Sequence, residues 1–320
     1  MNKTDLRIVF LGTPDFAVES LHRLVEGGYN VVGVVTMPDK TAGRGHKLLH
    51  SPVKEYALQQ GLRLMQPVKL KDPDFLAELS SLHADLFIVI AFRMLPREVW
   101  EMPPLGTFNL HASLLPRYRG AAPINRAVMA GETVTGVTTF MLKHEIDTGD
   151  ILRQESIAIG PDECVGSVHD RLMMLGAALT IDTVDRIIDG SLTPMPQAEL
   201  ITAGEEPIPA PKIFADDMTV RWDRAATEIH NLVRGLSPYP AARTTLADGD
   251  TVSDIKIYRT RLTDTPSADK PGTIHIDGDH LLVDTADRRI EILELQLAGK
   301  RRMPVADFLR GVRFIKPMFV

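Results

Sequence analysis

The hydrophobic positions in the first third of the chain form short apolar runs that are separated by stretches with helical spacing. Residues 6–11 form an apolar run that predicts a buried strand, and Gly12-Thr13-Pro14 predicts the turn after it. Residues 15–26 then carry apolar side chains at helical spacing, and residues 31–35 form the next apolar run. This order of strand, helix and strand predicts the start of a parallel α/β sheet.

The same periodicity extends the sheet further along the chain. Helices are predicted at residues 52–60 and 74–82, a strand at residues 86–91, and a long helix at residues 167–188 that ends at Gly190. No G-x-G-x-x-G motif follows the first strand, so the dinucleotide-binding fingerprint is missing. A dehydrogenase is therefore disfavoured.

Polar residues of types that often act in catalysis lie between the predicted strand at residues 86–91 and the predicted helix at residues 167–188. Residues 107–113 alternate between apolar and polar positions, which predicts a strand with Asn109 and His111 on the same face. The prolines and glycine of residues 116–123 then predict an irregular loop that carries Arg117, Tyr118 and Arg119. Ligands of open α/β sheets bind outside the carboxyl ends of the strands, so we expect a site here.

A carboxylate follows the next predicted strand. Residues 137–142 are apolar, and Asp147-Thr148-Gly149-Asp150 predicts a turn after them. Asp147 could reach the imidazole of His111, which would bring an amide, an imidazole and a carboxylate together. However, a single His on a strand is more often a hydrogen-bonded structural group, and Asp147 could merely shape its turn. Spacing alone leaves both interpretations open.

A basic loop follows the second predicted strand. Residues 38–47 contain Lys40, Arg44, His46 and Lys47 together with two glycines. One interpretation is a solvated surface loop, and the other is an arm that reaches the phosphate or sugar groups of a nucleic acid.

The last third of the chain has a different pattern. A proline-rich stretch at residues 192–210 predicts a linker between residues 1–191 and residues 211–320. After a predicted helix at residues 225–236, short strand-like runs alternate with turns such as Asp277-Gly278, a spacing typical of a small all-β barrel. The basic run of residues 300–302 fits either a solvated surface or a contact with RNA.

Composition and charge narrow the possibilities. The net charge of −6 does not suit a nucleic-acid-binding protein, but residues 211–320 hold 17 Lys and Arg against 16 Asp and Glu, so the acidity lies in the first 210 residues. The lone Cys164 cannot form an internal disulfide and is expected to be a small buried residue, and no Cys or His spacing predicts a zinc site. Without an apolar segment of signal-peptide or membrane-span length, we expect a cytoplasmic protein.

The run Asn109-Leu110-His111-Ala112-Ser113-Leu114-Leu115-Pro116-Arg117-Tyr118-Arg119-Gly120, followed by Asp147-Thr148-Gly149-Asp150, resembles the signature of the 10-formyltetrahydrofolate-dependent formyltransferase family. Within this family, nearly the whole chain is similar to the members that formylate methionyl-tRNA. The resemblance implies a Rossmann-like formyltransferase domain, hence an α/β fold, with a C-terminal OB-like β-barrel domain that binds tRNA.

The resemblance also implies roles for individual residues. Asn109, His111 and Asp147 would be catalytic, and residues 113–116, namely Ser113, Leu114, Leu115 and Pro116, would line the tetrahydrofolate site. The basic loop would approach the acceptor arm of the tRNA through Arg44, with Lys40 and Lys47 beside it. The implied partners are 10-formyltetrahydrofolate as co-substrate and the methionylated initiator tRNA, with no metal and no membrane, and we expect a monomer.

One segment departs from the family pattern, and several functions remain open. Residues 92–96 lack the Tyr-Gly pair of many members and are one residue shorter, so no site residue is assigned there. A formyltransferase acting on a sugar nucleotide or a ribonucleotide would share the three catalytic residues but lack the basic loop and the barrel. A hydrolase would use water as the acceptor. A non-catalytic RNA-binding protein would have no need of Asn109, His111 and Asp147 together.

Overall fold

The computed structural model describes residues 1–42, 47–201 and 206–320, without the side chains of residues 41, 42 and 47. The chain divides into two compact units that interleave in sequence. The first comprises Met1–Gly120, Gly136–Ile157 and His169–Pro209, and the second comprises Ala121–Thr135, Ala158–Val168 and Ala210–Val320. We call them the sheet unit and the barrel unit.

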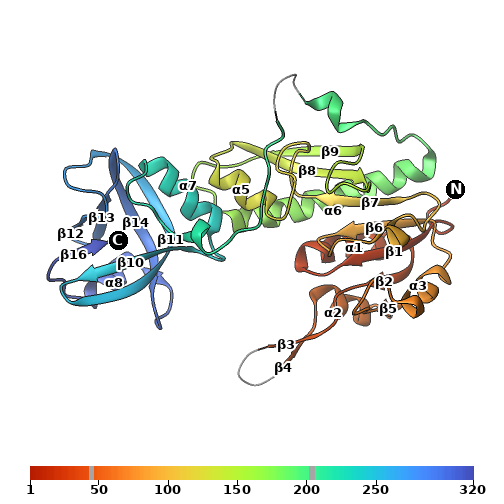
Figure 1. Cartoon of the computed structure of the whole chain (residues 1–320), viewed down its shortest axis with the longest axis horizontal. Helices are drawn as coiled ribbons and strands as arrows, with labels where there is room; N and C mark the ends of the chain where they lie inside the picture. The colour runs from red at the N-terminus through yellow and green to blue at the C-terminus, as the bar shows by residue number, and fades with distance from the viewer. Residues whose placement is uncertain (43–46, 202–205) are drawn as a thin grey trace. The chain divides into compact units, whose positions relative to one another are not determined.

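A mixed seven-stranded sheet forms the centre of the sheet unit (Figure 1), in the order β5-β2-β1-β6-β7-β8-β9. The strands from β5 to β7 pair in parallel, and β8 runs antiparallel to β7. The expected Rossmann-like α/β fold is therefore confirmed. The strands are β1 (Arg7–Gly12), β2 (Asn30–Val35), β5 (Leu64–Met65), β6 (Leu86–Ile90), β7 (Thr107–His111), β8 (Val134–Met141) and β9 (Ile151–Ala158).

Helices cover this sheet, and their starts follow from local sequence. Ser51 and Asp72 accept backbone N–H bonds as N-caps, and each is followed by a proline in the first helical turn, where the missing N–H costs nothing. The helices are α1 (Asp15–Glu26), α2 (Pro52–Gln59), α3 (Pro73–Ser80), α4 (Arg97–Trp100) and α6 (Val165–Asp189).

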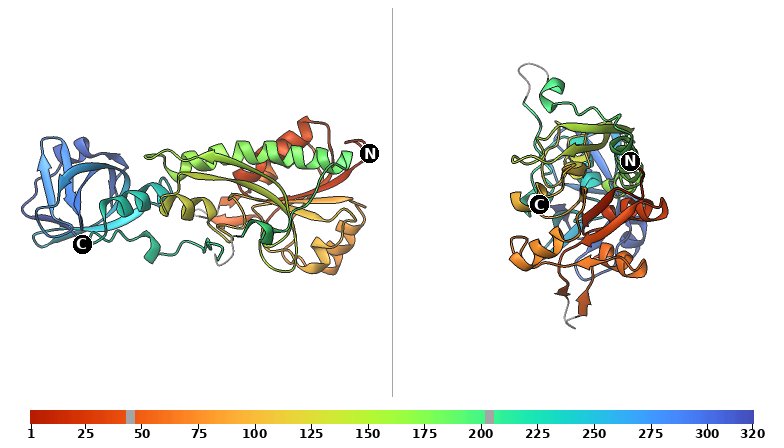
Figure 2. Two further views of the ribbon diagram at one scale, coloured as in Figure 1. Left: turned by 90° about the horizontal axis from the view of Figure 1, so that it is seen from above. Right: turned by 90° about the vertical axis from the view of Figure 1, so that its right-hand side faces the viewer.

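The long helix α6 packs along the sheet (Figure 2), with contacts to β7, β8 and β9. A Cβ on Gly176 would lie 2.7 Å from Leu110 Cδ2, so the glycine permits close approach to β7. The hydroxyls of Thr183 and Thr139 hydrogen-bond at 2.8 Å where α6 meets β8. The close approach at Gly176 thus packs α6 directly on β7, the strand with Asn109 and His111.

The expected basic loop is in part a hairpin. Strands β3 (Lys40–Ala42) and β4 (Lys47–Leu49) pair antiparallel and project from the body of the sheet unit (Figure 1). Asp39 fixes the base of this hairpin, because it accepts bonds from Lys54 Nζ at 2.5 Å and Gln66 Nε2 at 3.0 Å. These two hydrogen bonds, that of Lys54 above all, lower the pKa of Asp39.

The barrel unit contains an antiparallel sheet in the order β12-β13-β14-β11-β10-β16. A bridge between Thr273, next to β12, and Met318 in β16 brings its two edges together, so the expected β-barrel is confirmed as a nearly closed one. Its elements are α5 (Pro123–Met129), α7 (Ala226–Leu236), β10 (Ala242–Asp248), β11 (Thr251–Pro266), β12 (Ile274–Asp277), β13 (His280–Asp284), β14 (Arg288–Leu297), β15 (Met303–Pro304), α8 (Val305–Arg310) and β16 (Pro317–Phe319).

Apolar side chains of the strands and of α7 fill the barrel core, where Trp222 stacks on Phe319 with ring centroids 5.2 Å apart. The indole N–H of Trp222 donates to Thr244 Oγ1 at 2.9 Å, which satisfies its buried donor. Cys164, expected to be buried, is a half-buried free thiol.

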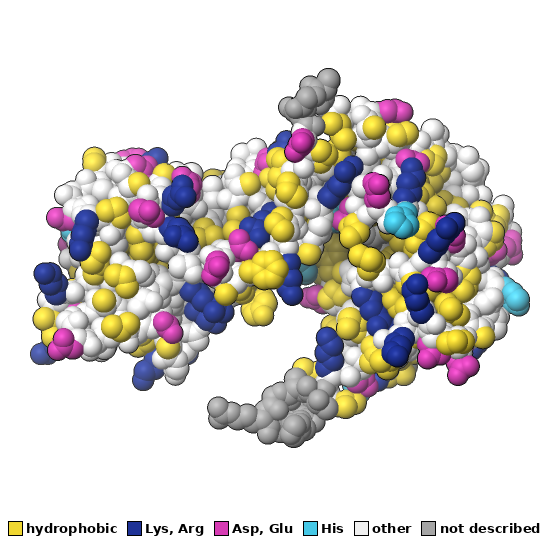
Figure 3. Space-filling model, in the orientation of Figure 1, with side chains coloured by type: hydrophobic (Ala, Val, Ile, Leu, Met, Phe, Trp, Pro, Cys, Tyr) yellow, Lys and Arg dark blue, Asp and Glu magenta, His cyan; other side chains and the backbone are white. Residues whose placement is uncertain are grey.

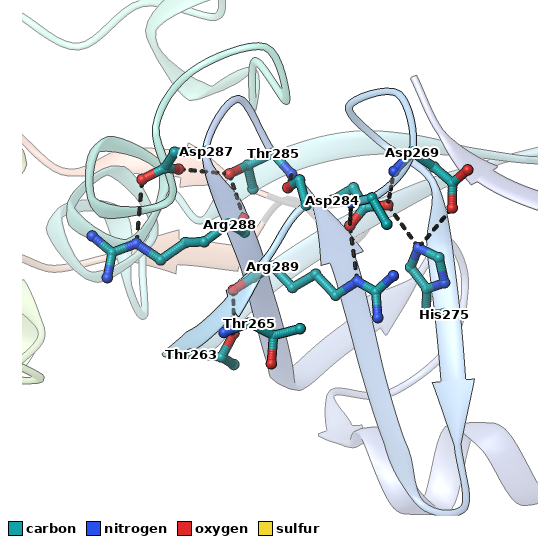
Figure 4. Close-up of polar contacts among 11 residues, drawn as sticks. Thr263, Thr265, Asp269, His275, Asp284, Thr285, Asp287, Arg288 and Arg289 are labelled. Carbon is teal, nitrogen blue, oxygen red and sulfur yellow. Dashed lines mark hydrogen bonds and ion pairs between the residues drawn. The ribbon is translucent and has the colours of Figure 1, made fainter.

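Two aspartates organise one end of the barrel (Figure 4). Asp284 is fully buried and accepts bonds from His275 Nε2 at 2.7 Å, Arg289 Nε at 2.9 Å and the backbone of Asp269 at 3.0 Å. Burial raises the pKa of Asp284, but these hydrogen bonds outweigh it and lower the pKa overall. Asp287 accepts the backbone N–H of Ala226 at 2.8 Å, so it caps the N-terminus of α7 from a distant part of the chain.

No helix in the described ranges is both long enough and apolar enough to cross a bilayer.

Candidate active site

His111 occupies the carboxyl end of β7, and its two ring nitrogens have different surroundings. Nε2 lies 2.9 Å from the carbonyl oxygen of Tyr118, which can only accept, so Nε2 carries a hydrogen. Nδ1 lies 4.0 Å from Asp147 Oδ2. The ring is 7% exposed and packs edge-on to Phe140. Nδ1 is therefore the nitrogen that gains or loses a proton, and it faces a carboxylate.

Asp147 lies in the loop after β8, in a strained conformation. Its φ is +55°, in the left-handed region, which costs about 1–2 kcal/mol for a residue with a Cβ. Its Oδ2 accepts the backbone N–H of Gly120 at 2.9 Å, and its side chain is 12% exposed. The structure thus brings His111 and Asp147 together, as the sequence analysis proposed, and the loop at Gly120 helps to hold the carboxylate.

Asn109 lies two residues before His111 on β7, so both side chains project from the same sheet face. Its buried Oδ1 has no hydrogen-bond partner among the residues that the structure describes. Leaving a buried acceptor unpaired costs about 1–3 kcal/mol, which points to a partner outside the chain.

Other unpaired atoms surround the same strand ends. Four buried side-chain polar atoms lack a partner within the described ranges, and three of them belong to Thr13, Arg93 and Asn109. Thr13 directly follows β1, Arg93 follows β6, and Asn109 lies in β7, and these three strands are neighbours in the sheet. Sequence analysis did not single out Thr13 or Arg93, since only the fold shows that their buried atoms are unpaired.

The segment expected to line the folate site is deeply packed. Ser113 is fully buried, and its hydroxyl donates to the carbonyl of Arg117 at 2.7 Å. Leu115 is buried against Phe140 and Ile151, Leu114 is half-buried, and Pro116 is buried after a cis peptide bond. The backbone groups of Ser113 and Leu115 are also bonded within the protein: the Ser113 carbonyl accepts from Thr138 Oγ1 at 2.7 Å, and the Leu115 carbonyl accepts from Gln154 Nε2 at 3.0 Å. The half-buried Leu114 is therefore the member of this segment that remains accessible to a ligand.

Residues 92–96, which follow β6 and differ from the family pattern, are held in place by Arg93. Its Nη1 donates to the carbonyl of Val68 at 2.8 Å and its Nη2 to that of Pro67. Burial lowers the pKa of Arg93.

The segment expected as a linker is bonded to the sheet unit. Met195 and Ile151 exchange backbone hydrogen bonds of 2.8 Å, and Gln197 is 3% exposed. Gln197 lies in a short 3-10 helix (Gln197–Leu200) and bonds to the loops of both Arg119 and Asp147. Its place beside the site could not be read from a proline-rich stretch.

The residues expected to contact tRNA lie in different surroundings. Lys40 is exposed in β3, Lys47 lies in β4 with a side chain outside the described set, and Arg44 lies outside the described residues. In the barrel unit, Lys300 and Arg301 are exposed, whereas Arg302 pairs with Glu294. Lys and Arg side chains are dispersed among Asp and Glu on the face seen in Figure 3.

Comparison with known families decides the assignment. Residues 6–184 match the family model described as formyl transferase, and residues 212–313 match that of the formyl transferase C-terminal domain. The chain belongs to the formyl transferase family. The formyl transferase signature thus coincides with the strand end where His111 and Asp147 meet.

Relatives of this formyl transferase match its sequence over nearly the full length. It is 59% identical over 317 residues to a methionyl-tRNA formyltransferase of Phocaeicola vulgatus, covering 98% of both chains. It is 54% identical over 314 residues to that of Bacteroides fragilis, covering 97% of this chain and 96% of the relative. Against that of Porphyromonas gingivalis it is 48% identical over 323 residues, with both chains fully covered.

Solved structures share the fold. An N-formyltransferase from Helicobacter canadensis, in complex with folinic acid and dTDP-3-aminofucose, matches with a TM-score of 0.66 at 18% identity, covering 90% of this chain and 98% of that one. HypX from Aquifex aeolicus, in complex with tetrahydrofolic acid, matches with a TM-score of 0.63 at 18% identity, covering 95% of this chain and 47% of that one.

Proposed function

We propose that this chain transfers the formyl group of 10-formyltetrahydrofolate to the free α-amino group of methionyl-tRNA, the initiator species, and so prepares it for translation initiation. The observation that carries the proposal is full-length identity of 48–59% to relatives named for this activity. The meeting of His111 and Asp147 at the strand ends supplies matching chemistry.

The reaction makes three demands on the site. The attacking nitrogen must be neutral, the carbonyl oxygen must be stabilised as it gains negative charge, and a proton must leave the attacking nitrogen. 10-Formyltetrahydrofolate supplies the formyl carbon: as the new bond to the α-amino nitrogen forms, the bond to the folate nitrogen breaks, and tetrahydrofolate leaves with a proton equivalent to the one that the amine loses. None of these demands needs a metal.

The three predicted catalytic residues meet these demands. The amide nitrogen of Asn109 donates hydrogen bonds to the oxygen that gains charge, and a protonated His111 Nδ1 strengthens that stabilisation. Asp147 faces His111 Nδ1 across a 4.0 Å gap, and accepts a proton directly or through water. Because Nε2 of His111 is hydrogen-bonded to the carbonyl oxygen of Tyr118, only Nδ1 is available to donate to the oxygen that gains charge.

The folate fits the strand ends between β1, β6 and β7. The buried unpaired atoms of Thr13, Arg93 and Asn109 match a ligand that carries both hydrogen-bond donors and acceptors, as a pterin does. Among residues 113–116, the half-buried Leu114 would contact the folate, and the buried Ser113, Leu115 and Pro116 would support this lining from within the protein.

The tRNA would be held by basic residues on both units. We propose that Lys40, Arg44 and Lys47 of the hairpin region contact the acceptor arm, and that residues 211–320 form the tRNA-binding barrel after a catalytic domain of residues 1–191 and a linker of residues 192–210. A projecting hairpin with an anchored base suits this role, because phosphate contacts need exposed positive charge.

The direct test measures movement of a labelled formyl group from 10-formyltetrahydrofolate onto methionyl-tRNA. We expect transfer to the methionylated initiator tRNA and none to uncharged tRNA. Transfer to an amino sugar nucleotide or a ribonucleotide instead would support another formyltransferase, release of formate without an amine would support a hydrolase, and RNA binding without turnover would support a non-catalytic protein.

We further propose that the enzyme acts as a monomer in the cytoplasm, where charged tRNA meets the ribosome. Light scattering during size-exclusion chromatography should give the mass of one chain, 35.4 kDa.

A further inference from the structure

The carboxamide of Gln197 makes four hydrogen bonds at the edge of the candidate active site. Its two N–H groups donate to the carbonyl oxygens of Asp147 at 2.9 Å and Gly149 at 2.8 Å. Its oxygen accepts from Nε and Nη2 of Arg119 at 3.1 and 2.7 Å. With 3% exposure, the buried amide has both donors and both lone pairs occupied.

These bonds join the two loops that hold the catalytic pair. One loop contains Arg119, Tyr118 and Gly120, and it binds His111 Nε2 through a carbonyl and Asp147 Oδ2 through a backbone N–H. The other loop is the turn of Asp147, whose backbone is left-handed. A conformation of this kind persists only where its surroundings enforce it, and Gln197 bonds the backbone on both sides of Thr148.

Neither glutamate nor alanine can replace the hydrogen bonds of this amide. Glutamate would keep an acceptor for Arg119, but it lacks donors and would face two carbonyl oxygens. Alanine would leave two carbonyls and a guanidinium without their partner. The requirement for donors and acceptors at once therefore selects glutamine at this position.

We propose that Gln197 is a positioning residue for formyl transfer, which sets the carboxylate of Asp147 against His111 Nδ1 by tying the turn of Asp147 to the loop of Arg119. This inference rests on the proposed function. Gln197 contacts no reacting atom and acts through Asp147.

The test compares Gln197→Ala and Gln197→Glu with the wild type and with Thr183→Val, which removes a buried hydrogen bond between α6 and β8 of the same unit. A misplacement of about 1 Å at a reacting group costs roughly 100-fold, so kcat should fall about 10–100-fold in both Gln197 variants. The KM for each substrate should change less than about 3-fold. Thr183→Val should lower the melting temperature without this loss of kcat, and a loss of kcat in Thr183→Val equal to that of Gln197→Ala would overturn the proposal.

A double-mutant cycle with Asp147→Ala, measured under single turnover, separates positioning from general destabilisation. In the Asp147→Ala background the Gln197→Ala change should cost less than about 2-fold, because there is no carboxylate left to place. An undiminished cost would overturn the inference while leaving the proposed function intact. Full activity of Asp147→Ala alone would instead overturn the proposed chemistry and this inference with it.

Discussion

The hydrogen bonds around Asn109 and His111 determine which atoms of these side chains can face a ligand or Asp147. The carbonyl of Tyr118 fixes the hydrogen on His111 Nε2, so the imidazole presents Nδ1 to Asp147 in either protonation state. The buried Oδ1 of Asn109 has no partner in the described part of the chain, and we propose that a ligand supplies one. At the residue scale, the site is therefore set by hydrogen bonds to the backbone and by one unsatisfied amide.

Replacing Asn109 or Asp147 by alanine should abolish most turnover without unfolding the protein. Loss of an oxyanion donor costs on the order of 100–1000-fold in turnover, and we expect a kcat decrease in that range for Asn109→Ala and at least as large for Asp147→Ala. Rapid-quench measurement of formyl-methionyl-tRNA checks this, with circular dichroism as the folding control. Near-normal turnover in either variant would refute the assigned chemistry.

At the scale of elements, the turn after β8 is shaped by close backbone approach. A Cβ on Gly149 would lie 1.6 Å from the carbonyl oxygen of Met141 at the end of β8, so no larger residue fits without moving the turn. Because Asp147 lies in the same turn, we expect the position of its carboxylate, which we propose to be catalytic, to depend on Gly149.

Gly149→Ala should therefore lower kcat by roughly 100-fold, through displacement of Asp147. The matched control is Gly160→Ala, where the nearest atom to a new Cβ, the Cβ of Glu163, lies 3.4 Å away, an ordinary contact. Steady-state kinetics of both variants give the comparison. If Gly149→Ala retained the activity of Gly160→Ala, the turn would not determine the position of the carboxylate.

The N-terminus of a second element, α7, is capped by a residue that lies far away in the sequence. Asp287 receives the backbone N–H of Ala226, and this bond above all lowers the pKa of Asp287 to about 2. A carboxyl group whose pKa is lower in the folded state stabilises the fold fully above its unfolded pKa of about 3.9, and loses that contribution as the pH falls toward 2.

Asp287→Ala should reduce the free energy of unfolding by about 0.5–1 kcal/mol at neutral pH, the lower part of the range for helix caps, since the side chain is 42% exposed. The difference from the wild type should shrink between about pH 4 and pH 2. Urea titrations across this range measure it, with the exposed Asp279→Ala as a control of equal charge change. A difference that stayed constant with pH would exclude the charged cap.

At the scale of the whole molecule, the acidic net charge is distributed unevenly between the parts of the chain. The first 210 residues hold 19 Lys and Arg against 26 Asp and Glu, and the rest is nearly balanced. Recognition of a polyanion must then rest on local groups such as the hairpin of β3 and β4, since the net charge opposes it.

Arg44→Ala should raise the KM for methionyl-tRNA several-fold more than the KM for 10-formyltetrahydrofolate. It should also make the KM for methionyl-tRNA depend less on salt concentration, because one phosphate contact is lost. Arg63→Ala is a suitable control, because Arg63 is exposed and paired with Glu78 in the same unit. Equal changes in both KM values would remove the basic segment from tRNA recognition.

Hydrophobic periodicity alone determined most of the element order. Helix α1 runs from Asp15 to Glu26 as predicted, and β6 and α7 agree within one residue, since burial of one face leaves a local pattern. The pattern missed α5 and β9, and it did not show the hairpin inside the basic segment. Short elements such as α5 carry too few turns to separate them from loops, and β9, although eight residues long, has a polar centre at residues 153–156 that breaks the alternation.

The sequence by itself determined the proposed catalytic set: an amide and an imidazole on one strand face and an aspartate in a glycine-containing turn. Only the tertiary structure decided that His111 Nδ1 faces Asp147, that Ser113 and Leu115 are buried, and that Gln197 from the proline-rich segment ties two loops together. Residue types follow from local pattern, whereas these contacts join positions up to 78 residues apart, which only the packing of strands and loops brings within hydrogen-bonding distance.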